Sequence, residues 1–127
     1  MLAVHIDEGR GTVTREPFVR DVRVLLSPLL QPELAATGVN VGYTEVAPGQ
    51  RGSRHAHAHE AEVWLFFAGH GLAIVGDEER EVGPGTVVYT PPGVEHQFVN
   101  TGAEPVRLYW FYAPSGAERA VLAAEFR

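Results

Sequence analysis

The sequence predicts an all-β fold, a double-sheet jelly roll that ends in one short helix. The chain holds 14 glycines and 9 prolines among 127 residues, more than an average protein carries. These residues fall between short runs of β-branched and aromatic residues, as a chain with many turns requires. A chain of 127 residues can form one hydrophobic core but not two, so we expect a single domain over residues 1–127.

Eight segments are predicted as strands because they are rich in β-branched and aromatic residues. In chain order they cover residues 22–26, 39–46, 63–67, 72–75, 79–82, 86–90, 97–99 and 106–112. Eight short strands suit a double-sheet jelly roll, whose barrel core we expect at about residues 39–113. Residues 27–38 contain two prolines and then Glu33-Leu34-Ala35-Ala36, which favours a loop with one helical turn.

A helix is predicted at the carboxyl end, where Ser115 and Glu118 form a capping-box pattern. One face of this helix carries an apolar stripe, formed by Ala117, Ala120, Val121 and Ala124. The stripe must pack on another surface, either the outer face of the barrel or a second subunit. Whether the helix closes the barrel mouth or belongs to a dimer interface stays open.

The charge and composition exclude several classes of function. The net charge is −6, and the ten basic residues are all arginines, spread from Arg10 to Arg127. An acidic chain without a basic stripe is not expected to bind nucleic acid. The absence of cysteine excludes disulfides and thiolate metal sites. The amino terminus lacks the features of a signal peptide, and no apolar stretch approaches membrane-spanning length, so we expect a cytoplasmic protein that does not bind membranes.

The first of two unusual stretches in the middle of the chain covers residues 49–69. It consists of glycine, five residues, His55, one residue, His57, four residues, Glu62, six residues and glycine. Side chains two apart in an extended segment point to the same face, so His55 and His57 should lie together. A turn at residues 58–61, followed by a β-prone strand, would bring Glu62 back beside them.

The second stretch covers residues 85–100 and consists of glycine, five residues, proline, one residue, glycine, two residues, His96, three residues and asparagine. The turn sequence Pro91-Pro92-Gly93 ends one strand and starts another, so His96 arrives from a different direction. Three imidazoles and one carboxylate suit iron, manganese, nickel, copper or zinc. We therefore expect one divalent metal ion per chain, whose identity the sequence leaves open.

Together the two stretches resemble both signature motifs of the cupin superfamily at every defined position. The fifteen residues between Gly69 and Gly85 match the short separation seen in small bacterial cupins. The resemblance implies a double-stranded β-helix barrel of the small, single-domain kind that binds a metal through His55, His57, Glu62 and His96. Small cupins commonly pair through edge strands, and the amino-terminal strands here are apolar at alternate positions, so we expect a homodimer.

Aromatic side chains are expected to wall a cavity beside the metal. Residues two apart on a strand share a face. If a metal ligand points into the cavity, the side chains two residues away on that strand point into it as well. On the last predicted strand, alternation directs into the cavity either Trp110 with Tyr112 or Tyr109 with Phe111. We choose the first pair as the candidate lining residues. The candidate substrate-binding residues are Trp64, Phe66, Phe98, Trp110 and Tyr112. Core packing is the alternative role for the first two.

Other polar residues near the motifs receive lesser roles. His59 continues the alternation of histidines, but an exposed turn with no catalytic role is the simpler interpretation, and a part for Glu60 stays open. Arg51, Arg54 and Arg107 are the only candidates to meet an anionic substrate, although solvated loop arginines are the commoner outcome.

The favoured function is that of a metal-dependent enzyme acting on a small organic molecule. Resemblance to metal-binding cupins with all four ligands implies dioxygenase-type oxidation, and an aromatic cavity favours an aromatic, enol or diketone-like substrate. Glu62 is the candidate catalytic residue, as a charge-balancing ligand and as a general base if it leaves the metal. The alternatives are a lyase, decarboxylase or isomerase, including a sugar-phosphate isomerase, and a non-enzymatic module that binds a small molecule.

Overall fold

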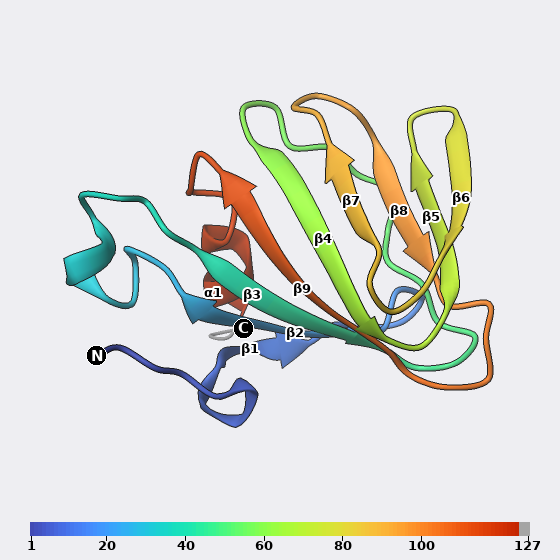
Figure 1. Ribbon diagram of the computed structural model, residues 1–127, viewed down its shortest axis with the longest axis horizontal. Coiled ribbons are helices and arrows are strands. Elements are labelled where there is room, and N and C mark those ends of the chain that lie inside the picture. The colour runs from blue at the N-terminus through green and yellow to red at the C-terminus, as the bar shows by residue number, and fades with distance from the viewer. Residues whose placement is uncertain (125–127) are drawn as a thin grey trace.

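The computed structural model describes residues 1–124. Over these residues the chain forms nine strands, two 3₁₀ helices and one α-helix: η1 Ile6–Glu8, β1 Arg10–Val13, β2 Asp21–Leu26, η2 Pro32–Leu34, β3 Val41–Val46, β4 Ala61–Ala68, β5 Gly71–Val75, β6 Glu78–Val82, β7 Val87–Thr90, β8 His96–Val99, β9 Val106–Ala113 and α1 Arg119–Ala124. The described strands make two antiparallel sheets, one in the order β1-β2-β3-β9-β4-β7 and one in the order β6-β5-β8. Figure 1 shows the shorter sheet beside the β4 and β7 end of the longer one. This is the predicted double-stranded β-helix with a short carboxyl-terminal helix.

All eight predicted strands are present, with ends that shift by one or two residues. The sequence prediction missed β1, a four-residue edge strand that pairs with β2. Its pattern is weak because it contains Gly11, a poor strand former. A side chain at Gly11 would collide with the carbonyl oxygen of Val22 on the neighbouring strand, so close approach of the two backbones requires glycine there.

Alternation along the central strands β4 and β9 directs one face of each into the space between the sheets. On β4 the buried positions include Glu62, Trp64 and Phe66. On β9, Trp110 lies opposite Trp64 and Tyr112 lies opposite Glu62. The register therefore places aromatic side chains around the carboxylate, as strand parity predicted.

The core lies between the two sheets. Val24, Val46 and Val106 are almost completely buried, with relative exposures of 0%, 1% and 0%. Each such side chain contributes about 1.5–3 kcal/mol relative to an exposed position. These three valines belong to one buried cluster with Ala73, Val82 and Phe98 of the shorter sheet, so core packing links the two sheets.

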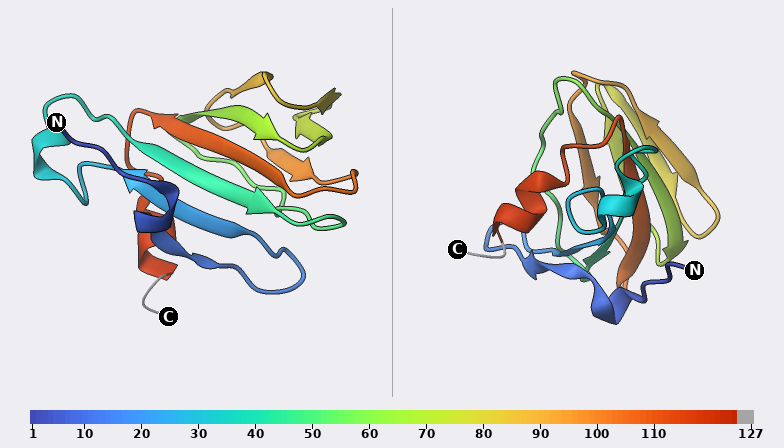
Figure 2. Two further views of the ribbon diagram at one scale, coloured as in Figure 1. Left: turned by 60° about the horizontal axis from the view of Figure 1, so that its bottom comes forward. Right: turned by 90° about the vertical axis from the view of Figure 1, so that its left-hand side faces the viewer.

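Helix α1 packs on β1 and β2, at the end of the longer sheet away from β7 (Figure 2). The predicted capping box is replaced by a different contact, because the carboxylate of Glu118 accepts hydrogen bonds from the amide of Gly116 and from the hydroxyl of Ser27, 2.7 Å away. Ser27 and Glu118 are both completely buried. None of the helices within residues 1–124 is long and apolar enough to cross a lipid bilayer.

Candidate metal centre

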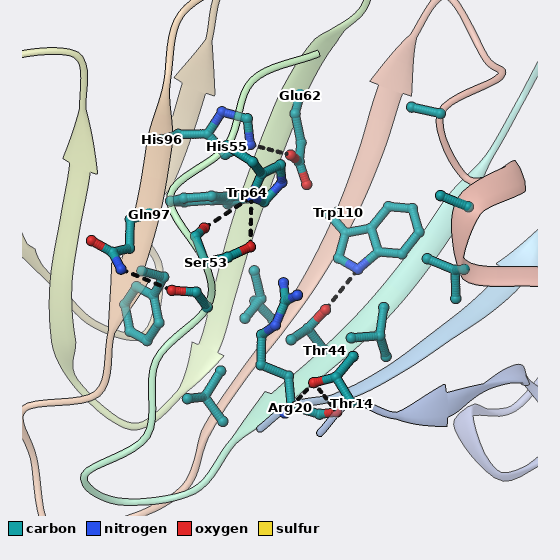
Figure 3. A pocket seen from close by; sticks show the side chains of 18 of the residues that line it. Thr14, Arg20, Thr44, Ser53, His55, Glu62, Trp64, His96, Gln97 and Trp110 are labelled. Carbon is teal, nitrogen blue, oxygen red and sulfur yellow. Dashed lines mark hydrogen bonds and ion pairs between the residues drawn. The ribbon is translucent and has the colours of Figure 1, made fainter. Parts of the chain in front are cut away.

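Four side chains meet at one end of the space between the sheets. One ligand atom from each of His55, His57, Glu62 and His96 lies within 4.8 Å of the others. His96 and Glu62 are buried, whereas the other two are half-buried. Figure 3 shows the imidazoles of His55 and His96 beside the Glu62 carboxylate. The structure thus brings together all four residues predicted as ligands.

Backbone pairing between the two motif stretches sets His55 opposite His96. The amide of His55 donates to the carbonyl of His96 at 3.1 Å, and the amide of His96 donates back at 2.8 Å. Further along, the amide of Gly93 donates to the carbonyl of His57 at 2.8 Å. His55 and His57 are alternate residues of one extended segment, so this pairing presents both to His96.

Glu62 enters the cluster from the longer sheet, near the start of β4. It lies opposite Thr90 on β7 and Tyr112 on β9. Its Oε1 atom is 3.0 Å from Nε2 of His96 and 3.4 Å from Nε2 of His57. Glu62 of the longer sheet and His96 of the shorter sheet therefore both contribute metal-ligand atoms, and the cluster joins the two sheets.

The donor atoms of the cluster lack hydrogen-bond partners within the described residues. Nε2 of His57, Nε2 of His96 and Oε1 of Glu62 are buried, and although they approach one another, none makes a hydrogen bond of acceptable geometry. Buried polar atoms are normally paired. A set of unpaired lone-pair donors that converges on one point fits a divalent metal ion.

The second nitrogens of two imidazoles face backbone carbonyl groups. Nδ1 of His55 lies 2.9 Å from the carbonyl oxygen of Ser53, and Nδ1 of His96 lies 3.2 Å from that of Val94. An N–H at Nδ1 that donates to these oxygens leaves Nε2 as the lone-pair donor. The backbone thus selects the tautomer that a metal ligand needs.

Burial and proximity favour the protonation states that bind metal. Burial by itself raises the pKa of Glu62, but contacts with His57 and His96 outweigh it and lower that pKa to about 2. Burial lowers the pKa of His55, and the hydrogen bond to Ser53 opposes this effect. An ionised carboxylate and a neutral imidazole are the forms that coordinate metal.

The cluster opens into a cavity of about 290 Å³ between the two sheets. This volume lies near the lower end of the range of small-molecule pockets, roughly 300–1,000 Å³. One side is covered by the predicted apolar stripe, Ala117, Ala120, Val121 and Ala124. The stripe therefore lines the cavity and does not pack on the outer face of the barrel.

Four of the five predicted substrate-binding residues line the cavity: Trp64, Phe98, Trp110 and Tyr112. Phe66 is not part of the lining over residues 1–124, although it shares their strand face. Its ring lies 5.1 Å from that of Phe98 and 6.1 Å from that of Trp64, behind them in the core. Strand parity gives the direction of a side chain but not how far along the strand a cavity extends.

A family model described as a cupin domain matches residues 42–112, more than half of the chain and inclusive of all four ligands. The chain belongs to the cupin family. Glucose-6-phosphate isomerase of Thermococcus gammatolerans is 36% identical over 80 residues, which cover 53% of this chain and 42% of the isomerase. The chain thus matches less than half the length of that relative.

Solved structures share the fold of this cupin. A predicted oxalate decarboxylase from Thermotoga maritima superimposes with a TM-score of 0.76 and 18% identity, over 87% of this chain and 97% of that one. A recombinant oxalate oxidase in complex with glycolate has a TM-score of 0.71 and 21% identity, over 84% of this chain and 56% of that one. At these identities the likeness shows the fold alone.

The glycines and the asparagine of the cupin motifs have structural roles. The motif glycines Gly49, Gly69, Gly85 and Gly93 all have positive φ, between 77° and 91°. At Gly69 a side chain would also collide with the carbonyl of Pro105.

Asn100, which closes the second motif, is 2% exposed and has its amide fully engaged. Its Nδ2 donates to the carbonyls of Val46 and Glu104, and its Oδ1 accepts from the amide of Gly102, all at 2.9 Å. It ties the turn after β8 to β3.

Within residues 1–124, Arg20 is the arginine that lines the cavity, and sequence reasoning did not select it. The three arginines that it did select face elsewhere. Arg51 lies 5.7 Å from the ring of Phe18, Arg54 pairs with an exposed glutamate, and Arg107 donates to Tyr43. Arg20 precedes the first predicted strand and belongs to no motif, so only alternation extended backward from β2 could have indicated it.

His59, the other candidate near the ligands, is exposed, and within the described residues it is not one of the four grouped donors. Glu60 is half-buried and likewise lies outside that group.

Proposed function

We propose that this cupin is a metal-dependent enzyme that oxidises a small organic molecule with dioxygen. The observation that carries the proposal is the opening of a four-donor cluster into a cavity with apolar and aromatic walls. A divalent metal bound there would supply Lewis acidity and, if it is redox-active, a centre for dioxygen chemistry. A dioxygenase-type reaction delivers both oxygen atoms to an electron-rich substrate and needs no separate reductant.

In this proposal some side chains hold the metal and others orient the substrate. The three histidines would hold the metal as neutral donors, and Glu62 would balance its charge and could accept a proton from the substrate. Burial raises the pKa of Tyr112 well above its usual value, and the nearby Glu62 charge raises it further. The phenol, whose ring lies 4.9 Å from that of His57, therefore stays protonated and able to donate a hydrogen bond.

The cavity wall favours a planar, weakly polar substrate. Trp64 and Trp110 lie opposite each other across the β4–β9 register, and the indole N–H of Trp110 is already bonded to Thr44 at 2.9 Å. Rings held in this way offer flat apolar surfaces. An aromatic or enol compound matches these walls better than a polyhydroxylated sugar does.

A non-oxidative isomerisation is the second candidate. The similarity to glucose-6-phosphate isomerase over 53% of this chain supports it. Such chemistry needs proton transfer between neighbouring carbons, for which Glu62 is the available base. The apolar walls count against a sugar phosphate as the substrate.

The proposal is tested by metal analysis of protein purified without a His-tag, followed by anaerobic reconstitution with ferrous iron. Oxygen uptake is then recorded with a panel of catechols and enols. We expect about one metal per chain and compound-dependent uptake that His96→Ala abolishes and His59→Ala retains. Metal binding without uptake would favour the non-oxidative reaction, and the same assay with sugar phosphates would detect isomerisation.

We also expect the protein to form a homodimer and to be located in the cytoplasm. Sedimentation at micromolar concentration tests the first, and a monomer would refute it. Fractionation of cells that express the native gene tests the second.

A further inference from the structure

Arg20 brings a positive charge into a cavity whose other lining residues, apart from the metal ligands, are apolar or uncharged polar residues. It follows the β1–β2 loop, where its amide donates to Thr14 Oγ1 at 2.8 Å and its carbonyl accepts from the amide of Thr14 at 2.8 Å. This double contact fixes the backbone from which the side chain leaves. In Figure 3 the guanidinium points from the loop toward the middle of the cavity.

The guanidinium of Arg20 has N–H groups that make no hydrogen bond within residues 1–124. Within residues 1–124 the side chain of Arg20 forms no hydrogen bond or ion pair, and its Nε atom is buried without a partner. A guanidinium carries five N–H donors and stays charged in proteins. Burial lowers the pKa of Arg20, and the nearby Glu62 opposes that shift without making a direct contact. A buried, unpaired donor is costly, so the site is built for a missing acceptor.

Two other polar side chains in the cavity, those of Thr44 and Gln97, are already engaged within the protein, and the hydroxyl of Tyr112 is an uncharged donor. The hydroxyl of Thr44 accepts the indole N–H of Trp110 at 2.9 Å, and the amide of Gln97 donates to the carbonyl of Gly52 at 2.9 Å. Outside the four metal ligands, the guanidinium is thus the charged donor available to a ligand in the described part of the cavity.

The chain also makes room for this side chain. Gly52 lies against it, and a methyl group at that position would sit 3.3 Å from Cδ and from Nη1 of Arg20. Such spacing is tighter than ordinary van der Waals contact. Glycine at residue 52 lets the guanidinium keep its position.

We infer that Arg20 is the anion subsite of the cavity and pairs with the carboxylate of a small ligand whose oxygen donors reach the metal cluster. A guanidinium binds a carboxylate through two parallel N–H···O bonds, which fixes orientation as well as affinity. A single cation matches a singly charged carboxylate better than a doubly charged phosphate. The inference rests on the proposed function in that it narrows the substrate to an aromatic or enol carboxylate.

Binding to zinc-loaded protein tests the inference without requiring turnover. The probes are 3,4-dihydroxybenzoate and 4-methylcatechol, which share the chelating end and differ in the carboxylate. By isothermal titration we expect the wild-type protein to bind the carboxylate compound about 10- to 100-fold more tightly, as a charged hydrogen-bonded pair implies. Arg20→Gln should reduce its affinity to that of 4-methylcatechol and leave 4-methylcatechol unchanged.

Arg80→Gln is the matched control, because it removes the same charge from an exposed position on β6. It should preserve the preference, and Arg20→Lys should restore only part of it, since lysine cannot form the paired bonds. Equal affinities in the wild type, an unchanged preference in Arg20→Gln, or failure of both probes to bind would each overturn the inference. Glucose 6-phosphate preferred over both probes would overturn the carboxylate in favour of a phosphate.

The two proposals fail separately. A carboxylate preference with no oxygen uptake in iron-loaded protein would keep the anion subsite and reject the oxidation. Oxygen uptake with no carboxylate preference would keep the oxidation and reject the anion subsite.

Discussion

The metal end of the cavity and its opposite end are built from different kinds of sequence. The four metal ligands lie within residues 49–100, where every glycine, proline and asparagine of the motifs has a defined position. Arg20 and the stripe of α1 come from segments on either side, outside the matched residues 42–112.

This difference reflects what each end must do. Metal coordination fixes distances to a fraction of an ångström, so the ligands sit on paired backbone segments with fixed turns. A wall that contacts an organic molecule needs only suitable size and polarity. We expect substitutions in the motif region to remove the metal and substitutions in the flanks to change which molecule binds.

The largest effect is expected for His96→Ala. It removes a buried donor at the junction of both sheets and should reduce bound metal from about one per chain to below about a tenth, as measured by elemental analysis. His57→Ala should act in the same way, at modest cost in stability. His59→Ala is the control and should keep the metal; loss of metal from His59→Ala with retention in His57→Ala would show that the ligand register is wrong.

Glu62→Gln should weaken metal binding and alter the response to acid. The low folded pKa of Glu62, about 2, means that its carboxylate stabilises the metal-free fold above its unfolded pKa. That stability is lost as the pH falls from about 4.5 toward 2. Urea unfolding at several pH values should show a shallower acid dependence in Glu62→Gln than in the wild type. Identical slopes would mean that the carboxylate is not held ionised by its neighbours.

Ala117→Leu tests the flank without touching the metal end. Ala117 is half-buried and lines the cavity from the segment before α1, so three added carbons should occupy part of the space. We expect the affinity of the zinc-loaded protein for 4-methylcatechol to fall about tenfold, with the metal content unchanged. Loss of metal in this variant would show that the two ends are not separable.

The smallest effect on the cavity and its metal is expected for Ser27→Ala. It removes the hydroxyl that donates to the buried carboxylate of Glu118 and should cost about 1–3 kcal/mol in the free energy of unfolding. Urea denaturation measures this cost, and Thr37→Ala, at an exposed position, is the control. Metal content should remain at the wild-type level. An unchanged midpoint would mean that Glu118 finds another donor.

The sequence predicted most of the strands and brought the ligand residues together because both depend on local spacing. Alternation and turn residues located the eight strands, and two-residue spacing placed His55 and His57 on one face. It wrongly placed Phe66 in the cavity lining, did not predict the location of Arg20, and left open which surface lies under α1. Each of these depends on how far distant segments approach one another, which no local pattern contains.

The paired backbone amides of His55 and His96 also bear on how the protein would exchange its ion. Main-chain bonds and a sheet hold the imidazoles in position before any ion arrives, so little structure has to form around it. A zinc finger, by contrast, depends on its metal to fold. Chelators should therefore strip this protein while leaving it folded, and the emptied barrel should accept whichever divalent ion its surroundings provide.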